Sequence, residues 1–186
     1  MEHILQVVLI AVLLLASSVL VLWKAGRDYR RIGSLSTASS ILQIMLFVLH
    51  AAASLVLLES RVSTIDTRSP LFGFALLLIA GGLVMLVATL GRLGMRRTIG
   101  QDASGLTCSG IYRRSRNPQV IAYGIAVLGY SLLWPSWTGV AWVVLYAAIA
   151  QMMVRTEEKH LRRKYGDDYV TYCQLTPRYM DLPGMK

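Results

Sequence analysis

Three long runs of apolar residues dominate the first half of the chain. They cover residues 4–23, 38–58 and 71–90, and each is about as long as the roughly 20 residues that a helix needs to cross a bilayer. The first run lacks a basic start and a clear small-residue cleavage site, so we expect a retained helix and not a signal peptide. The third run contains Gly73, Gly81 and Gly82, and small residues let membrane helices approach closely.

The composition excludes several other classes of protein. Hydrophobic residues make up 55% of the 186 residues and charged residues 16%, with a mean hydropathy of +0.53. Soluble domains carry about 25% charge, and disorder requires low hydrophobicity. Two cysteines are too few for a disulfide scaffold. The net charge of +9 is better explained by basic loops that meet anionic lipid than by nucleic-acid binding.

Two shorter apolar runs, residues 119–134 and 138–154, lie close together in the second half. At about 1.5 Å per residue each forms a helix of roughly 25 Å, and the short connection between them predicts a tight antiparallel hairpin. Trp134, Trp137 and Trp142 would suit an interface belt. We therefore predict an all-α integral membrane protein with about five transmembrane helices, the last two a tight helical hairpin, followed by an amphipathic C-terminal segment.

The predicted protein is one membrane domain over residues 1–186. Its parts are three N-terminal spans in residues 1–91, a loop at 92–118, the hairpin at 119–154 and a C-terminal segment at 155–186.

The basic residues predict an orientation. Four lie between the first two spans, two between the second and third, six in the loop before the hairpin and seven after it. The positive-inside rule places the richer segments and the C-terminus in the cytoplasm, and five crossings then leave the N-terminus outside. The expected location is the plasma or inner membrane of a prokaryote, or the endoplasmic reticulum of a eukaryote.

Polar residues concentrate on both sides of the predicted hairpin. A tight hairpin returns the chain to its starting side, so it should bring Arg116, Asn117 and Pro118 close to Glu157 and Glu158. Cys108 and Cys173 would be reduced thiols on the cytoplasmic side. Neither cysteine has metal-ligand spacing and the three histidines are scattered, so we expect no metal site.

The residue types in this region suit a particular ligand chemistry. Gly105 and Gly110 permit turns with positive φ and a close backbone approach to a ligand. Arg116 can bind a carboxylate with two hydrogen bonds, and the glutamates can accept from ribose hydroxyls or an ammonium group. Tyr112 adds an aromatic face. A ligand with carboxylate, amine, ribose and adenine groups would use all of them.

Each of these features also has a simpler explanation. The arginines of the loop can serve only as inside-positive anchors, and Glu157 and Glu158 can be an ordinary pair of charges on a helix. The joint occurrence of these residues at hairpin spacing is what favours a binding site.

The order of these motifs resembles the isoprenylcysteine carboxyl methyltransferase family, and it is similar to the related membrane phospholipid methyltransferases. The resemblance covers residues 90–183. It rests on Gly110, Tyr112, Arg116, Asn117, Pro118, the hydrophobic hairpin, Glu157, Glu158, Tyr165, Gly166, Tyr169, Tyr172, Pro177 and Arg178.

The resemblance implies a membrane methyltransferase that binds S-adenosylmethionine at the cytoplasmic edge, under the C-terminal segment. The lipophilic acceptor would enter from the bilayer between helices. Neither a metal ion nor a nucleic acid is expected as a partner. The implied catalytic residues are Arg155, Glu157 and Glu158, with the arginine positioning a carboxylate and a glutamate taking the proton of an amine. The implied cofactor-binding residues are Ser104, Gly105, Leu106, Thr107, Gly110, Tyr112, Arg116, Asn117, Pro118, Gln119, Val120 and Glu157.

Three positions depart from the carboxyl methyltransferase pattern. Asn117 replaces a histidine, Val120 a tyrosine, and Ser104 stands where family members often have a histidine. Asn117 is closer to the phospholipid methyltransferases. Arg155 matches the family's substrate-side arginine only in being nearby, because strict spacing points to Met153.

Several functions remain open from the sequence. The first is methyl transfer to a lipophilic, membrane-embedded acceptor, as in isoprenylcysteine carboxyl methyltransferases. The alternatives are ethanolamine-phospholipid N-methylation, an NADPH-dependent membrane reductase, and a non-enzymatic membrane scaffold.

Overall fold

The computed structural model describes residues 2–59, 62–93 and 105–180, and in these ranges the fold is all-α. The helices follow the predicted spans in order, and α2, α3 and α5 agree with them to within a few residues, whereas α1 and α6 extend further toward the C-terminus. The elements are α1 (Glu2–Arg31), α2 (Thr37–Glu59), the 3-10 helix η1 (Val62–Thr64), α3 (Pro70–Leu93), the 3-10 helix η2 (Gly110–Arg113), α5 (Pro118–Leu132) and α6 (Trp137–Leu175).

Four of the described helices, α1, α2, α3 and α6, are long and apolar enough to cross a membrane. The fifth, α5, has 15 residues and so extends only about 22 Å, less than the roughly 30 Å of a hydrocarbon core. The predicted fourth crossing, the first helix of the hairpin, is therefore a short helix that packs between α3 and α6.

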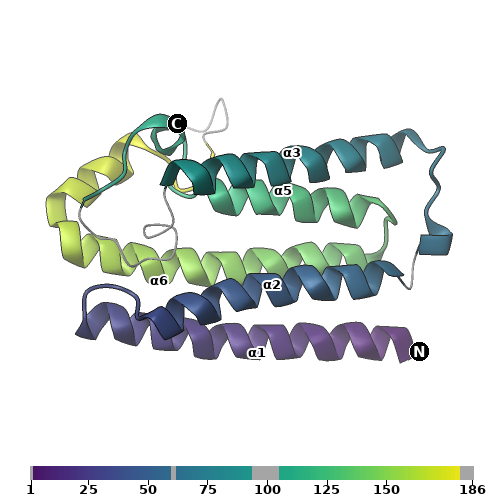
Figure 1. Cartoon of the computed structure of the whole chain (residues 1–186), viewed down its shortest axis with the longest axis horizontal. Helices are drawn as coiled ribbons and strands as arrows, with labels where there is room; N and C mark the ends of the chain where they lie inside the picture. Colours follow the sequence, from purple (N-terminus) through teal and green to yellow (C-terminus); the bar gives the residue numbers. More distant parts are fainter. Residues whose placement is uncertain (1, 60–61, 94–104, 181–186) are drawn as a thin grey trace.

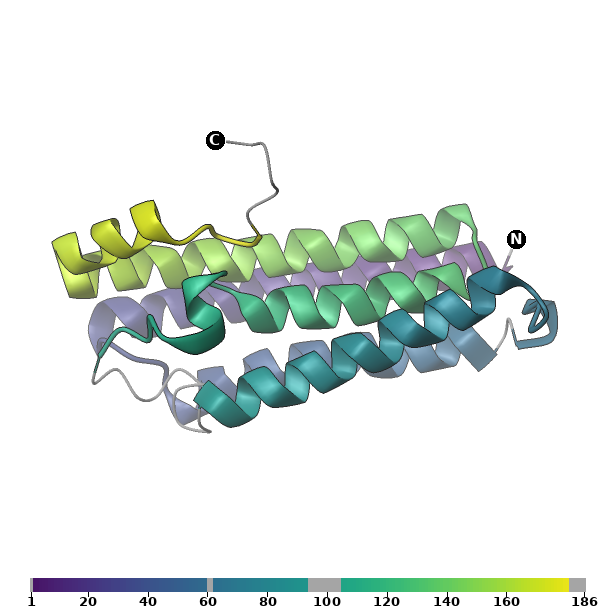
Figure 2. The same cartoon turned by 90° about the horizontal axis from the view of Figure 1, so that it is seen from above.

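The helices form an elongated antiparallel bundle (Figures 1 and 2). α1 packs against α2 and α6, α5 packs against α6, and α3 packs mainly against α5. The N-terminus, η1 and the α5–α6 turn lie at one end (Figure 1). The α1–α2 connection, η2 and the end of α6 lie at the other, so the polar stretches on both sides of the hairpin share one end of the bundle.

The contact between α3 and α5 depends on glycine. A Cβ atom added at Gly82 of α3 would lie 2.6 Å from Ala126 N and 2.7 Å from Ala122 O. One added at Gly129 of α5 would lie 2.7 Å from Ala75 O. The backbones therefore touch, as small residues permit between membrane helices.

The close helix approach expected at the glycines of the third apolar run is confirmed at Gly82. It is wrong at Gly73 and Gly81, where an added Cβ atom would meet nothing within 4 Å.

Gly82→Ala should separate α3 from α5 and lower the free energy of unfolding by about 1–3 kcal/mol. Gly81→Ala is the matched control and should be neutral or slightly stabilising, because it adds helix propensity without a clash. Thermal unfolding in detergent measures both, and equal melting temperatures would contradict the contact.

Aromatic side chains of α5 and α6 pack around His50 in the middle of α2. Its imidazole stacks on Trp142 at 4.8 Å and lies 3.0 Å from the hydroxyl of Tyr123. Trp142 is 2% exposed and donates from Nε1 to Ser54 Oγ at 2.8 Å, so its expected place in an interface belt is wrong. Trp137, 89% exposed at the start of α6, does suit a belt.

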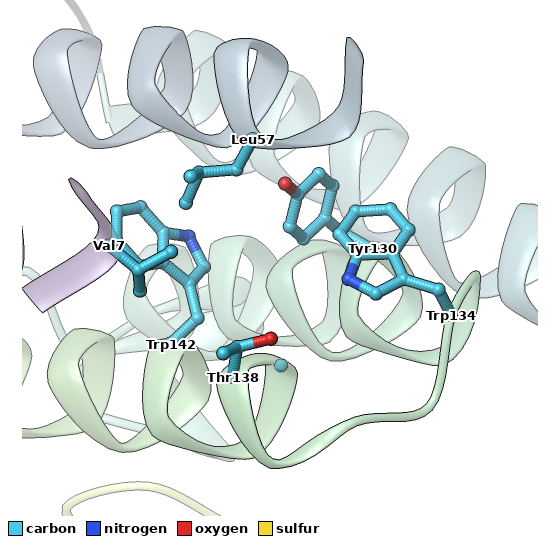
Figure 3. Close-up of a pocket in the computed structure, with 7 residues that line it drawn as sticks. Val7, Leu57, Tyr130, Trp134, Thr138 and Trp142 are labelled. Carbon is cyan, nitrogen blue, oxygen red and sulfur yellow. The ribbon is translucent and has the colours of Figure 1, made fainter. Parts of the chain in front are cut away.

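A small apolar pocket lies at the end of the bundle that contains the α5–α6 turn (Figure 3). The two hydroxyl groups of its wall have partners, since Tyr130 donates to the Ser54 carbonyl and Thr138 bonds Ser136. Its lining is Val7, Leu57, Tyr130, Trp134, Thr138, Gly139 and Trp142. The pocket lies at the opposite end from the predicted cofactor residues.

α6 extends well beyond the predicted hairpin. Its 39 residues would be about 58 Å long if straight, roughly twice the thickness of a hydrocarbon core, so only the apolar part, residues 137–154, can lie in the bilayer. The helix continues through the expected boundary at Val154 without a break. It kinks at Gly166, where φ is 51°, and the chain then folds back along the helix (Figure 2).

Candidate functional site

A carboxylate of α6 is held by two guanidinium groups at the polar end of the bundle. It connects α6 with the loop before α5 and with the segment that follows α6. Arg116 Nη1 donates to Glu158 Oε1 at 2.7 Å, and Arg178 Nη2 donates to Glu158 Oε2 at 2.6 Å. The side chains of Arg116 and Glu158 are only 11% and 15% exposed, whereas that of Arg178 is 39% exposed. The expected proximity of Arg116 to the glutamates is confirmed, and we call these three residues the clamp.

The Arg116 guanidinium makes further contacts. Its Nη1 atom also lies 3.2 Å from the Tyr169 hydroxyl and 2.8 Å from Cys173 Sγ. Its Nε atom is buried and has no hydrogen-bond partner among the described residues. An anionic group would supply the partner that this buried N–H lacks within the described ranges.

Residues 176–180, which we call the strap, lie across the loop that precedes α5. The backbone N–H of Arg116 donates to the Pro177 carbonyl at 3.0 Å, and Asn117 Nδ2 donates to the Arg178 carbonyl at 3.0 Å. Asn117 is 5% exposed. Its amide therefore holds the strap in place, and its described hydrogen bond is to the protein.

Tyr112 is buried in η2, which begins at Gly110. Gly110 has a φ of +62°, as expected for the turn, but Gly105 does not adopt a positive φ. The Tyr112 hydroxyl donates to Gln119 Oε1 at 3.2 Å. The backbone carbonyl of Tyr112 accepts from the Tyr172 hydroxyl at 2.7 Å. Burial, and then the charge of Glu157, raise the pKa of Tyr112 to about 12, so the phenol is neutral.

Glu157 lies in the charged part of α6, beyond the apolar residues. Its carboxylate acts electrostatically on Tyr112 and on Tyr29 of α1. Burial, and then the neighbouring Glu158, raise the pKa of Glu157. Among the described residues Glu157 forms no ion pair, in contrast to Glu158 in the clamp. The two adjacent glutamates therefore differ in what they can bind.

The three predicted catalytic residues do not form one cluster. At about 100° per residue, Arg155 and Glu157 project some 200° apart around α6. Arg155 is exposed. With the Gln151 amide oxygen turned toward it, that oxygen accepts from Arg155 Nε at 3.1 Å and Nη2 at 3.3 Å. Glu158 lies in the clamp, so Glu157 is the member of the predicted set whose carboxylate is neither exposed nor ion-paired within the described residues.

The other predicted cofactor residues have different surroundings. Ser104 lies outside the described residues, and Gly105, Leu106 and Thr107 are half-buried ahead of η2. Pro118 is fully buried, and the Val120 side chain packs in the apolar core while its carbonyl accepts from Tyr146 at 2.5 Å. Pro118 and Val120 thus hold the start of α5 in place.

Sequence reasoning missed Tyr29 and His160 near this site. Their rings stack at 4.1 Å with an interplanar angle of 11°. An aromatic residue at the polar end of a span is typical of an interface belt, so nothing in the sequence connects Tyr29 with α6. Arg178 belongs to the motifs on which the family resemblance rests, but the sequence predicts no role for it. The structure places it in the clamp.

Comparison with known proteins identifies the class of this molecule. A sequence profile described as phospholipid methyltransferase matches residues 71–168, more than half of the chain. The protein is thus an integral membrane methyltransferase that uses S-adenosylmethionine. It belongs to the phospholipid methyltransferase family, which is grouped with the isoprenylcysteine carboxyl methyltransferases. No curated protein and no solved structure matches significantly.

The described residues fit the chemical groups of this cofactor. Glu157 can accept hydrogen bonds from ribose hydroxyls, and Tyr112 offers an aromatic face. The buried Arg116 Nε, which has no partner among the described residues, suits a carboxylate. The donors and acceptors therefore agree in type with S-adenosylmethionine.

Proposed function

We propose that this enzyme transfers a methyl group to a lipophilic, membrane-embedded acceptor at the end of the bundle that holds the clamp. The observation that carries the proposal is Glu157, a half-buried carboxylate without an ion pair among the described residues, whose charge acts on the buried Tyr112. The proposed cofactor-binding set is Ser104, Gly105, Leu106, Thr107, Gly110, Tyr112, Arg116, Asn117, Pro118, Gln119, Val120 and Glu157.

The roles within this set follow from the contacts. Glu157 and Tyr112 face the cofactor, while the clamp and Asn117 hold the loop and the strap around it. The cofactor supplies an electrophilic methyl group, so the protein contributes mainly proximity and alignment. The sulfonium charge also favours a site with a carboxylate and aromatic rings.

The acceptor is a lipid, and two kinds are supported by different observations. The resemblance to isoprenylcysteine carboxyl methyltransferases favours a carboxylate, which is ionised near pH 7 and needs no general base. The family match favours a phospholipid amine, which must lose a proton. Since Glu158 is held by two guanidinium groups, Glu157 is the carboxylate of the pair that can take this proton.

Titration of the detergent-purified protein with S-adenosylhomocysteine tests the cofactor site. We expect saturable binding, followed by labelled methyl transfer either to phosphatidylethanolamine or to an S-prenylcysteine substrate in mixed micelles. Absence of binding to folded protein would overturn the proposal. Binding without transfer to either acceptor would reject both acceptor classes and leave the cofactor site intact.

We propose that Arg155 contacts an anionic group of the acceptor. It is the first charged residue after the apolar part of α6, and it lies on the exposed face where a lipid headgroup arrives. Arg155→Ala should lower turnover at least tenfold and leave S-adenosylhomocysteine binding unchanged, because the arginine points away from Glu157. Lys159→Ala, one helical turn along the same face, is the control, and equal turnover in both variants would remove Arg155 from the mechanism.

We infer that the clamp end of the bundle faces the cytoplasm. The basic residues at the end of α1, in η2 and just after it, and in the second half of α6 support this orientation. Protease digestion of a C-terminal tag in inside-out and right-side-out vesicles tests it, and cleavage only in right-side-out vesicles would reverse the assignment.

A further inference from the structure

The first helix packs directly against the charged part of α6. Ala25 of α1 is fully buried, and a Cβ atom added at the neighbouring Gly26 would lie 3.6 Å from Thr156 Cγ2. Tyr29 lies one helical turn after Gly26, on the same side of α1. The helix therefore brings an aromatic side chain to the level of Thr156 and Glu157.

The Tyr29 ring is held flat against His160. The ring centroids are 4.1 Å apart with an interplanar angle of 11°, and His160 is only 6% exposed. Burial, and then the nearby Lys164 and Arg163, lower the pKa of His160 to about 4, so the imidazole is neutral at physiological pH. Two neutral rings in this stacked arrangement fix the direction of the phenol.

The Tyr29 ring is stacked one helical turn of α6 away from the proposed cofactor-binding carboxylate. Glu157 precedes His160 by three residues, so both project toward the same side of α6. The charge of Glu157 acts on the hydroxyl of Tyr29 from one element and on that of Tyr112 from another. Tyr29 lies outside the segment that matches the family profile, residues 71–168.

We propose that Tyr29 is a positioning residue for Glu157: the stack on His160 fixes the phenol on the side of α6 that bears the carboxylate that receives the cofactor. The inference rests on the proposed function of Glu157. It means that α1, which the family match does not include, completes the cofactor site and is required for full affinity.

The test compares two variants of Tyr29. Tyr29→Phe keeps the stack and removes the hydroxyl, so we expect S-adenosylhomocysteine to bind about three- to tenfold more weakly, with an unchanged melting temperature. Tyr29→Leu also removes the stack and should weaken binding further. Trp23→Phe is the matched control, because Trp23 is exposed on the same helix and should bind the ligand as the wild type does.

A double-mutant cycle separates this role from a general structural one. If Tyr29 acts through Glu157, Tyr29→Phe should weaken binding in the wild type but cause no further loss in a Glu157→Gln background. Additive losses, or wild-type affinity in Tyr29→Phe, would overturn the inference. If Glu157→Gln alone has no effect, the proposed role of Glu157 itself is rejected; if it weakens binding while Tyr29→Phe does not, only the role of Tyr29 is rejected.

Discussion

Glu158→Ala should destabilise the folded protein by about 3–5 kcal/mol, because it removes the carboxylate that two guanidinium groups share. In the folded chain Arg116 and Arg178 both donate to this side chain, and Arg116 is largely buried. Without Glu158 two positive charges would face each other with no counter-ion. Thermal or denaturant unfolding in detergent measures the loss.

The position next to the clamp provides the control for this prediction. Lys159 is exposed, so Lys159→Ala should change the free energy of unfolding by less than about 0.5 kcal/mol. The clamp also holds the strap over the loop, so Glu158→Ala should lose cofactor binding as a consequence of lost structure. A variant that keeps the wild-type melting temperature but loses binding would show that Glu158 contacts the ligand and is not structural.

Glu157→Gln, at the neighbouring position, should weaken cofactor binding without lowering the stability of the fold. We expect S-adenosylhomocysteine affinity to fall about 10- to 100-fold, because hydrogen bonds to a charged acceptor contribute about 1.5–3 kcal/mol. The free energy of unfolding should not fall, since the described residues contain no ion partner for Glu157. Calorimetric titration and unfolding of the same preparation measure both quantities.

The stability of Glu157→Gln should depend on pH in a defined direction. Burial and Glu158 raise the pKa of Glu157 above the value of about 4.3 in an unfolded chain, so the folded state holds the proton more tightly. Ionisation of this carboxylate therefore costs stability as the pH rises through its folded-state pKa. Glu157→Gln should be more stable than the wild type at neutral pH, and the difference should disappear below about pH 4.

A stability difference that grows as the pH falls would contradict the raised pKa of Glu157. Unchanged affinity for S-adenosylhomocysteine would remove Glu157 from the cofactor site. These two outcomes are independent, because the first concerns the environment of the carboxylate and the second concerns its ligand.

Several elements of the fold could be predicted because their causes are local. The length of each apolar run sets the extent of α2 and α3, and the short connection after α5 makes α5 and α6 antiparallel. The same geometry predicts that Arg116 meets the glutamate pair. Hydropathy contains no comparable signal for where α6 stops, and its continuation to Gly166 was not expected.

Other expectations failed where the answer depends on which helices touch. Gly81 and Gly82 are adjacent and alike in sequence, yet only Gly82 faces α5. Trp137 and Trp142 both suited a belt, but Trp142 projects into the bundle and bonds Ser54. A residue's position on a helix is local, whereas the partner of that face is set by the whole bundle.

The sequence by itself determined the class of this protein: an all-α membrane bundle with its polar chemistry on both sides of a hairpin, since apolar length and charge placement act along the chain. Only the tertiary structure decided how two adjacent glutamates divide their roles. Glu158 binds two arginines, whereas Glu157 has no ion pair among the described residues and its charge acts on tyrosines of α1 and η2. Successive residues on a helix point about 100° apart, so their surroundings depend on segments distant in sequence.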